Sequence, residues 1–257
     1  MSLLKIDEVT KVYEGKVTHR ALNQLSFEVE KGEFLAVMGP SGSGKTTLLN
    51  LISTIDSLTA GEILIDGVNP HRLDKNELAL FRRRKLGFVF QDFNLLQMLT
   101  VEENLVLPLT LDYVPINDMA TRVLELAKRL DLTAILHKRP NEISGGEAQR
   151  TAIGRALIHK PVIILADEPT GNLDSKASRD VLDLLSKVSA NEGATIVMVT
   201  HDPIAASYCD RVLFIKDGEF FNEIYGDERR QTFYQRILNV LSLLGGNVND
   251  LSATRLP

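Results

Sequence analysis

An α/β fold with a largely parallel sheet is the class that this sequence of 257 residues predicts. The chain contains four short, continuous apolar runs, which are typical of buried parallel strands. Each run is followed by a polar residue or a glycine-rich turn, and in an open α/β sheet that edge is where ligands bind. The four runs are Phe34–Met38, Leu86–Phe90, Val162–Ala166 and Thr195–Val199.

Alternating segments near the N-terminus predict a second, antiparallel group of strands. Residues 2–35 alternate apolar and polar side chains, as in Leu25–Glu30, ahead of a turn at Lys31–Glu33. The segment Gly61–Gly67 adds another short strand. These strands precede or flank the first apolar run, so we expect them to belong to the same core.

Residues 92–160 change character and predict a helical part. A helix is expected to start at Val101 and to break near Pro108, because proline removes an N–H donor. Apolar side chains spaced by three and four residues predict an amphipathic helix over residues 117–131, capped by Asn117 or Asp118.

The changes of pattern along the chain predict its domain organisation. We expect a single domain over residues 1–226, with a core of 1–91 and 161–226 and a helical subdomain of 92–160. Residues 227–257 form a C-terminal helix and tail, whose helix ends at Gly245 and Gly246. We favour docking of this helix on its own domain over contact with a partner. Its apolar face contains Phe233, Ile237, Val240, Leu241 and Leu244.

The segment Gly39–Thr46 fits the phosphate-binding pattern G-x-x-x-x-G-K-[ST]. It follows an apolar strand and precedes a helical stretch, which is the context that the pattern requires. Its glycines allow backbone N–H groups to approach phosphate oxygens, Lys45 supplies a positive charge, and Thr46 offers a hydroxyl to Mg²⁺. The alternative is a Gly/Ser-rich turn with a surface lysine.

Two later segments carry further candidate groups. Ser144–Glu147 opens a helix, where N–H groups and the helix dipole suit an anion; the alternative is a flexible turn with a serine cap. Asp167 and Glu168 end the third apolar run. An aspartate there can hold the Mg²⁺ shell and a glutamate can orient or deprotonate water, unless both are solvated acids.

Taken in order, these segments resemble the ATPase subunits of ABC transporters. The matching motifs are the Walker A loop at Gly39–Thr46, Gln91, the signature Ser144–Glu147, the Walker B acids and His201. The resemblance covers residues 2 to 220. It implies a P-loop NTPase (RecA-like) core with an antiparallel β subdomain and an inserted α-helical subdomain.

The resemblance also implies ATP and Mg²⁺ as cofactors and assigns a role to each matched residue. Glu168, His201 and Gln91 would be catalytic, and Thr46, Gln91 and Asp167 would hold the metal. Tyr13 would stack on adenine. The full set of nucleotide-contacting positions is Tyr13, Gly39, Pro40, Ser41, Gly42, Ser43, Gly44, Lys45, Thr46, Thr47, Ser144, Gly145, Gly146, Glu147 and Asp174.

In this family, the signature of one copy contacts the γ-phosphate held by a second, facing copy. The resemblance therefore implies a homodimer on ATP binding, attached to an integral membrane permease at the cytoplasmic face of the membrane. Two positions depart from the commonest pattern. Glu147 stands where glutamine is usual, so it can accept but not donate a hydrogen bond, and Asn172 begins a loop that elsewhere starts with alanine.

Several stretches are similar to the bacitracin-resistance type of Gram-positive bacteria. These stretches are Phe90–Leu96, Thr200–Cys209 and Arg230–Phe233. The similarity implies defence against peptides that bind cell-wall lipid intermediates, with a sensor histidine kinase reached through the permease. The alternative within transporters is a lipoprotein-release, macrolide-efflux or cell-division ATPase. A ribosome- or DNA-acting ABC ATPase and a P-loop kinase or GTPase are two further alternatives.

Composition and charge reduce the number of functional classes that fit this sequence. The net charge is −5, so no overall basic field attracts nucleic acid, and we expect no nucleic-acid partner. The basic cluster Arg82–Lys85 reads as a solvated face rather than a nucleic-acid patch. Cys209 is the single cysteine and is expected to pack in a helix. No secretory signal and no run long enough to span a bilayer is recognised.

The residues after Gln91 are too apolar for a plain surface loop. Two interpretations stand at this point: the side chains form a socket for a short cytoplasmic helix of the permease, or they pack the helical subdomain onto the core. The side chains concerned are Phe93, Leu95, Leu96, Met98 and Leu99.

Overall fold

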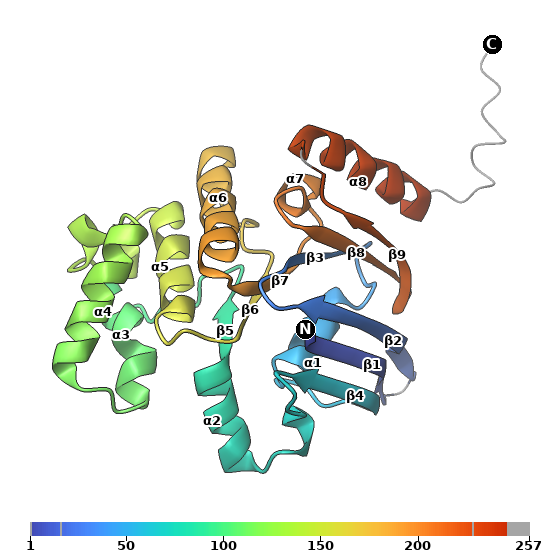
Figure 1. Cartoon of the computed structure of the whole chain (residues 1–257), viewed down its shortest axis with the longest axis horizontal. Coiled ribbons are helices and arrows are strands. Elements are labelled where there is room, and N and C mark those ends of the chain that lie inside the picture. The colour runs from blue at the N-terminus through green and yellow to red at the C-terminus, as the bar shows by residue number, and fades with distance from the viewer. Residues whose placement is uncertain (1, 16, 228, 246–257) are drawn as a thin grey trace. The chain divides into compact units, whose positions relative to one another are not determined.

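The computed structural model describes residues 2–15, 17–227 and 229–245. Its chain divides into two compact units, which are described separately: the first contains Met1–Asn69 and Val199–Pro257, and the second contains Pro70–Met198. These bounds differ from the predicted subdomain bounds, which stay a prediction. Figure 1 shows the elements of both units in chain order. None of the described helices is long and apolar enough to cross a membrane.

The first unit contains the predicted antiparallel strands. They form a three-stranded sheet in the order β2-β1-β4, with β1 antiparallel to both neighbours. Alternation places one face in the core, because Leu4, Ile6 and Val9 of β1 are buried while residues between them are not. The strands are β1 (Ser2–Tyr13), β2 (His19–Glu30) and β4 (Ala60–Ile65).

A second group of strands in the first unit positions the phosphate loop. β3 is buried at every residue, as its continuous apolar sequence requires, and it pairs in parallel with β8, which pairs with β9. Arg211 of β8 is 8% exposed and binds Glu33 and Glu223, so its buried charge is neutralised. The remaining elements of this group are β3 (Phe34–Met38), α1 (Lys45–Ile52), α7 (Pro203–Ala206), β8 (Arg211–Lys216) and β9 (Glu219–Tyr225).

The C-terminal helix α8 (Arg230–Gly245) docks on its own unit, as predicted. Its buried side chains include Phe233, Ile237 and Val240, and the helix contacts α7 and β9. The predicted tail, residues 247–257, lies outside the described residues. Cys209 is buried, but it lies in the bend after α7 rather than in a helix, so that detail of the prediction is wrong.

The second unit combines strands with a cluster of helices. Its strands follow the order β5-β6-β7, and β5 pairs with β6 in parallel. A separate apolar cluster joins α3, α4 and the end of α5, and it lies in the predicted helical part. Its buried residues include Leu105, Leu126 and Ile158, the last of which is the C-cap of α5. The elements are η1 (Pro70–Arg72), α2 (Lys75–Lys85), β5 (Leu86–Val89), α3 (Val101–Leu111), α4 (Ile116–Arg129), η2 (Thr133–Ile135), η3 (Pro140–Glu142), α5 (Gly145–Leu157), β6 (Ile163–Asp167), α6 (Ser175–Glu192) and β7 (Thr195–Val199).

Two predictions about these helices are wrong. Helix α3 continues through Pro108 to Leu111, because the missing N–H costs one hydrogen bond, to the Asn104 carbonyl, while packing of the helix against α5 holds it in place. Helix α4 is not capped by Asn117 or Asp118. It begins one residue earlier, after Pro115, whose fixed φ suits the approach to a helix.

The basic cluster closes helix α2. Arg82–Lys85 forms its last turn, where positive charge complements the negative end of the helix dipole. Arg83 donates to the Leu111 carbonyl at 2.6 Å and Arg84 to Asp112 at 2.8 Å. These contacts join α2 to the end of α3 and give the cluster a structural role.

Candidate active site

The phosphate loop of the first unit lies between β3 and α1. Gly39 has no room for a side chain, because a Cβ there would come 2.1 Å from the Ile215 carbonyl oxygen. Gly44 has a φ of 99°, in the left-handed region that favours glycine, and it is the N-cap of α1. Both glycines therefore stand where the backbone geometry requires them.

Lys45 places a positive charge inside this loop. Its Nζ donates to the Gly39 carbonyl at 2.9 Å and the Pro40 carbonyl at 2.8 Å, and its side chain is largely buried. Because the N-cap Gly44 has no side chain, the first N–H groups of α1 are not capped by it. An ammonium beside the positive end of a helix forms an anion site.

Two more predicted residues of the first unit lie near this loop. Thr200 donates from its backbone N–H to the Val37 carbonyl at 3.2 Å, so the exposed His201 follows beside the end of β3. Tyr13 ends β1, is 40% exposed and donates to Asp56, in the segment that follows α1. Tyr13 is thus tied to the segment after α1 and His201 lies beside the end of β3, so each is placed next to an element that flanks the loop.

Three predicted polar groups of the second unit meet at the carboxyl ends of β5 and β6. Val89 pairs with Ala166, which places Gln91 near Asp167 and Glu168. The segment after Glu168 returns to Gln91: a Cβ on Gly171 would lie 2.9 Å from the Gln91 Nε2, and Asn172 donates to the Gln91 carbonyl at 3.2 Å.

Glu168 adopts an unusual backbone conformation. Its φ is 45°, in the left-handed region that a glutamate rarely occupies. Non-glycine residues in this region carry strain and cluster at functional sites, where the surrounding structure maintains them. The conformation turns the chain sharply after β6.

The signature segment caps helix α5. Ser144 is the N-cap, and its hydroxyl and N–H both donate to Glu147 Oε2 at 2.7 Å, in a capping box. Hydrogen bonds from the Ser144 N–H and hydroxyl hold the pKa of Glu147 below its usual range, so the side chain is a carboxylate at neutral pH. Glu147 thus stabilises the segment in which it stands.

A cavity of about 290 Å³ lies beside the signature glycines. Asp174 lines it and caps helix α6, and hydrogen bonds from the N–H groups of Ala177 and Lys176 lower the pKa of this carboxyl. The contact of Asp174 with nucleotide stays a prediction. The lining residues also include Ser144, Gly145, Gly146, Arg150, Asn172 and Leu173.

Two residues of α5 that were not predicted from the sequence connect the signature helix to the segments at Gln91 and Glu168. Gln149 of α5 is fully buried, and its Nε2 donates to the Pro169 carbonyl at 2.6 Å and the Phe90 carbonyl at 3.4 Å. Arg155 of α5 donates to the carbonyls of Asn94 and Phe93. Their polar character on a helix with apolar neighbours is the signal that could have found them.

The apolar residues after Gln91 were predicted either to form a socket for a permease helix or to pack inside the protein, and the structure shows some buried and some exposed. Leu95 is buried and packs with Phe93 against Ala148 and Ala152 of α5. Leu96 is 48% exposed and Met98 is 86% exposed. Packing in this cluster thus accounts for Phe93 and Leu95, whereas the exposed Leu96 and Met98 and the half-buried Leu99 do not belong to it.

Comparisons with known proteins agree with the fold and the motifs. The family described as ABC transporter matches residues 22–171. The chain is 59% identical to the ABC transporter ATP-binding protein YxdL of Bacillus subtilis, over 99% of both chains. It is 49% identical to the bacitracin export ATP-binding protein BceA of Halalkalibacterium halodurans, over 97% of this chain and 100% of that one.

More distant relatives include fused proteins and solved structures. The macrolide export ATP-binding/permease protein MacB of Mannheimia succiniciproducens is 42% identical over 87% of this chain and 35% of its own length. The dimeric structure of the ATP-binding cassette MJ0796 of Methanocaldococcus jannaschii, bound to ADP and Pi, matches with a TM-score of 0.80. That likeness has 42% identity and covers 88% of this chain and all of the other.

The fold and the site define a P-loop ATPase of the ATP-binding cassette type. This chain belongs to the ABC transporter family and resembles its Gram-positive bacitracin-type group.

Proposed function

We propose that this protein is the ATP-hydrolysing subunit of a transporter that protects a cell from cell-wall-targeting antimicrobial peptides of the bacitracin or lantibiotic type. The observation that carries the transport role is the complete set of cassette motifs in one chain. The similarity to BceA over nearly the whole of both chains supports the peptide class. A macrolide-efflux, lipoprotein-release or cell-division role is the second candidate, supported by the similarity to MacB.

In this proposal the two groups of polar residues divide the chemistry. Lys45 and the N–H groups of the loop bind the β- and γ-phosphates, and Tyr13 stacks on the base. Thr46, Gln91 and Asp167 offer the hard oxygen donors that Mg²⁺ prefers. When bound, Mg²⁺ would neutralise charge on the phosphate oxygens. Glu168 orients and deprotonates the attacking water, and His201 binds the γ-phosphate.

The signature segment would complete the site of a second copy. The N-terminus of α5, with Ser144 and the following glycines beside a cavity, suits an anion supplied from outside the chain. We therefore infer a homodimer that forms on ATP binding. The dimeric cassette MJ0796 with ADP and Pi supports this arrangement.

A groove in the second unit suits a permease helix. A cavity of about 460 Å³ has apolar walls from Leu86, Phe88, Leu107 and Leu111. Three cations also line it, namely Arg82, Arg83 and Arg155. His159 lines it as well, and burial lowers the pKa of its imidazole, which favours the neutral form. These walls fit a short helix with apolar and acidic side chains, and the subunit would dock there at the cytoplasmic face of the membrane.

The groove is joined to the candidate active site by Arg155. This residue lines the groove and donates to the Asn94 carbonyl at 2.7 Å and the Phe93 carbonyl at 3.0 Å, just after Gln91. Movement of a helix in the groove would therefore reach Gln91 through one side chain and a short loop. We infer that this route couples hydrolysis to the permease, and that a sensor histidine kinase is reached only through the permease.

Replacing Leu111 by Asp is expected to abolish permease binding at this groove. Leu111 is 51% exposed, so a carboxylate there stays solvated and the subunit folds, but it opposes an apolar or acidic partner. Co-purification of the subunit with its permease measures the effect. The matched control is Leu124→Asp on α4, a leucine 48% exposed that does not line the groove. Equal binding by both variants would contradict the docking proposal.

The proposed protection against cell-wall-targeting peptides is tested in the organism whose genome encodes this protein. Deletion of the gene should lower the bacitracin or lantibiotic concentration that stops growth, and the wild-type gene should restore it, because resistance requires ATP-driven work. Complementation with Leu111→Asp should fail, whereas Leu124→Asp should succeed. Sensitivity to macrolides alone, with unchanged peptide tolerance, would favour the second candidate.

A further inference from the structure

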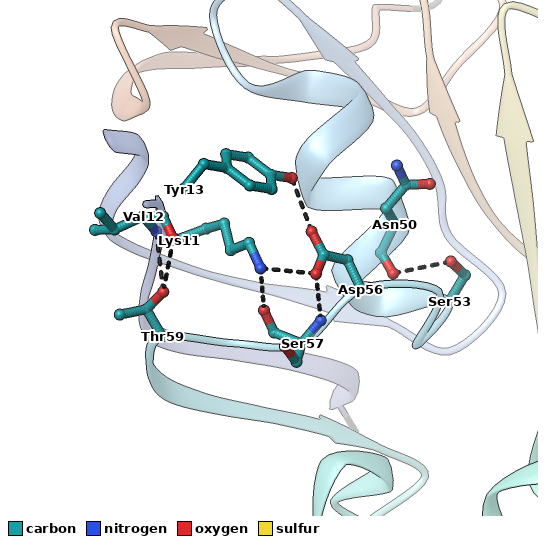
Figure 2. A network of polar contacts seen from close by, with 8 residues as sticks. All are labelled: Lys11, Val12, Tyr13, Asn50, Ser53, Asp56, Ser57 and Thr59. Carbon is teal, nitrogen blue, oxygen red and sulfur yellow. Dashed lines mark hydrogen bonds and ion pairs between the residues drawn. The ribbon is translucent and has the colours of Figure 1, made fainter. Parts of the chain in front are cut away.

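The ring of Tyr13 is held by a network of polar contacts at the end of β1. Its hydroxyl donates to Asp56 Oδ2 at 2.8 Å, and the Lys11 ammonium lies over its ring, 4.7 Å from the ring centroid. Figure 2 shows both groups converging on the same carboxylate. Tyr13 is therefore fixed at its hydroxyl and on one face of its ring.

Asp56 is held in place by further hydrogen bonds besides the one from Tyr13. Its Oδ1 accepts from Lys11 Nζ at 2.7 Å and from the Ser57 N–H at 2.7 Å, while Lys11 also donates to the Ser57 carbonyl at 2.8 Å. The Lys11 side chain is only 9% exposed, so its charge depends on this carboxylate. The Asp56 carboxylate is thus a rigid acceptor for Tyr13.

The network leaves one part of the ring available. Lys11 lies over one face of the ring, and Tyr13 as a whole stays 40% exposed, so the network leaves part of this residue open to a ligand. Burial raises the pKa of the Tyr13 phenol, and the hydrogen bond to Asp56 raises it further, so the hydroxyl remains a donor at neutral pH. The ring is therefore presented in a single orientation.

We propose that Asp56, held by Lys11, is a positioning residue that fixes Tyr13 for stacking on the adenine base. This inference rests on the proposed nucleotide contact of Tyr13 and adds two residues that the motifs do not contain. An aromatic side chain already fixed in its bound orientation loses less conformational entropy when a base stacks on it. The alternative is that the network only stabilises the fold, by holding β1 against the segment after α1.

Tyr13→Phe separates these roles because it removes the hydroxyl and keeps the ring. Titration of the purified full chain with ADP and Mg²⁺ should give a Kd about threefold to tenfold higher, the usual worth of one hydrogen bond. Titration with pyrophosphate, which has no base, should give an unchanged Kd. The matched control is Tyr225→Phe, which removes a tyrosine–carboxylate hydrogen bond to Glu223 on β9 and should alter neither value.

A double-mutant cycle with Asp56→Asn tests whether the carboxylate acts through the tyrosine. Asp56→Asn should weaken ADP binding in the wild-type background and clearly less in Tyr13→Phe, because the part of its effect that acts through the hydroxyl is already absent there. Additive losses, or an equal loss of pyrophosphate affinity, would assign the network to structure alone and overturn the proposal. If Tyr13→Ala binds ADP normally while Lys45→Ala does not, the stacking role fails and the phosphate site stands.

Discussion

Glu168→Gln is expected to slow ATP hydrolysis by at least about 10²-fold, the low end for removal of a general base. The amide has almost the same shape as the carboxylate, so it fits the left-handed backbone at this position, but it cannot take a proton from water. Nucleotide affinity should be unchanged. Phosphate release measures turnover, and light scattering with ATP and Mg²⁺ should reveal a trapped dimer.

The control for this variant is Glu125→Gln on the exposed surface of α4. It makes the same chemical change in the same unit and should hydrolyse ATP at the wild-type rate. If Glu168→Gln also turned over normally, the role of general base would belong to another residue and the proposed chemistry would be wrong at this position.

Lys45→Ala is expected to raise the Kd for ATP by about 10²-fold, since hydrogen bonds from a charged donor are worth about 1.5–3 kcal/mol. The ammonium lies inside the phosphate loop, bonded to the carbonyls of Gly39 and Pro40, where bound phosphate would meet it. Calorimetric titration measures the affinity directly.

Thermal unfolding separates loss of charge from loss of structure in this variant. Lys31→Ala, at the exposed turn before β3, removes a lysine from the same unit and should bind ATP normally. A Lys45→Ala protein with wild-type affinity would remove the phosphate loop from the site. An unfolded Lys45→Ala protein would be replaced by Lys45→Met, which keeps the apolar stem and lacks the charge.

The buried strands were predictable because a strand buried on both faces has a nearly continuous apolar sequence. β3 and β7 match the predicted runs at both ends, since every residue of each is buried and all but Thr195 are apolar. Helix α5 was predictable from its cap, because the spacing of Ser144 and Glu147 is a local signal. Local patterns of this kind do not depend on the rest of the fold.

Contacts between distant segments were not predictable in the same way. Lys11 and Asp56 are separated by 45 positions, and neither belongs to a recognised motif. The continuation of α3 through Pro108 depends on its packing against α5, which outweighs the preference of a single residue. The interactions of the individual site residues with nucleotide stay predictions that the proposed variants test.

The buried Gln149 connects the signature helix α5 by hydrogen bonds to two loops at once. Its single amide nitrogen bonds carbonyls that precede Gln91 and follow Glu168, so only a donor of this length satisfies both. A glutamate would turn a negative oxygen toward two carbonyl oxygens, and an alanine would leave both without this donor. The Gln149 side chain therefore ties α5 to both loops, so a shift of α5 would move the loop at Gln91 and the loop at Glu168 together.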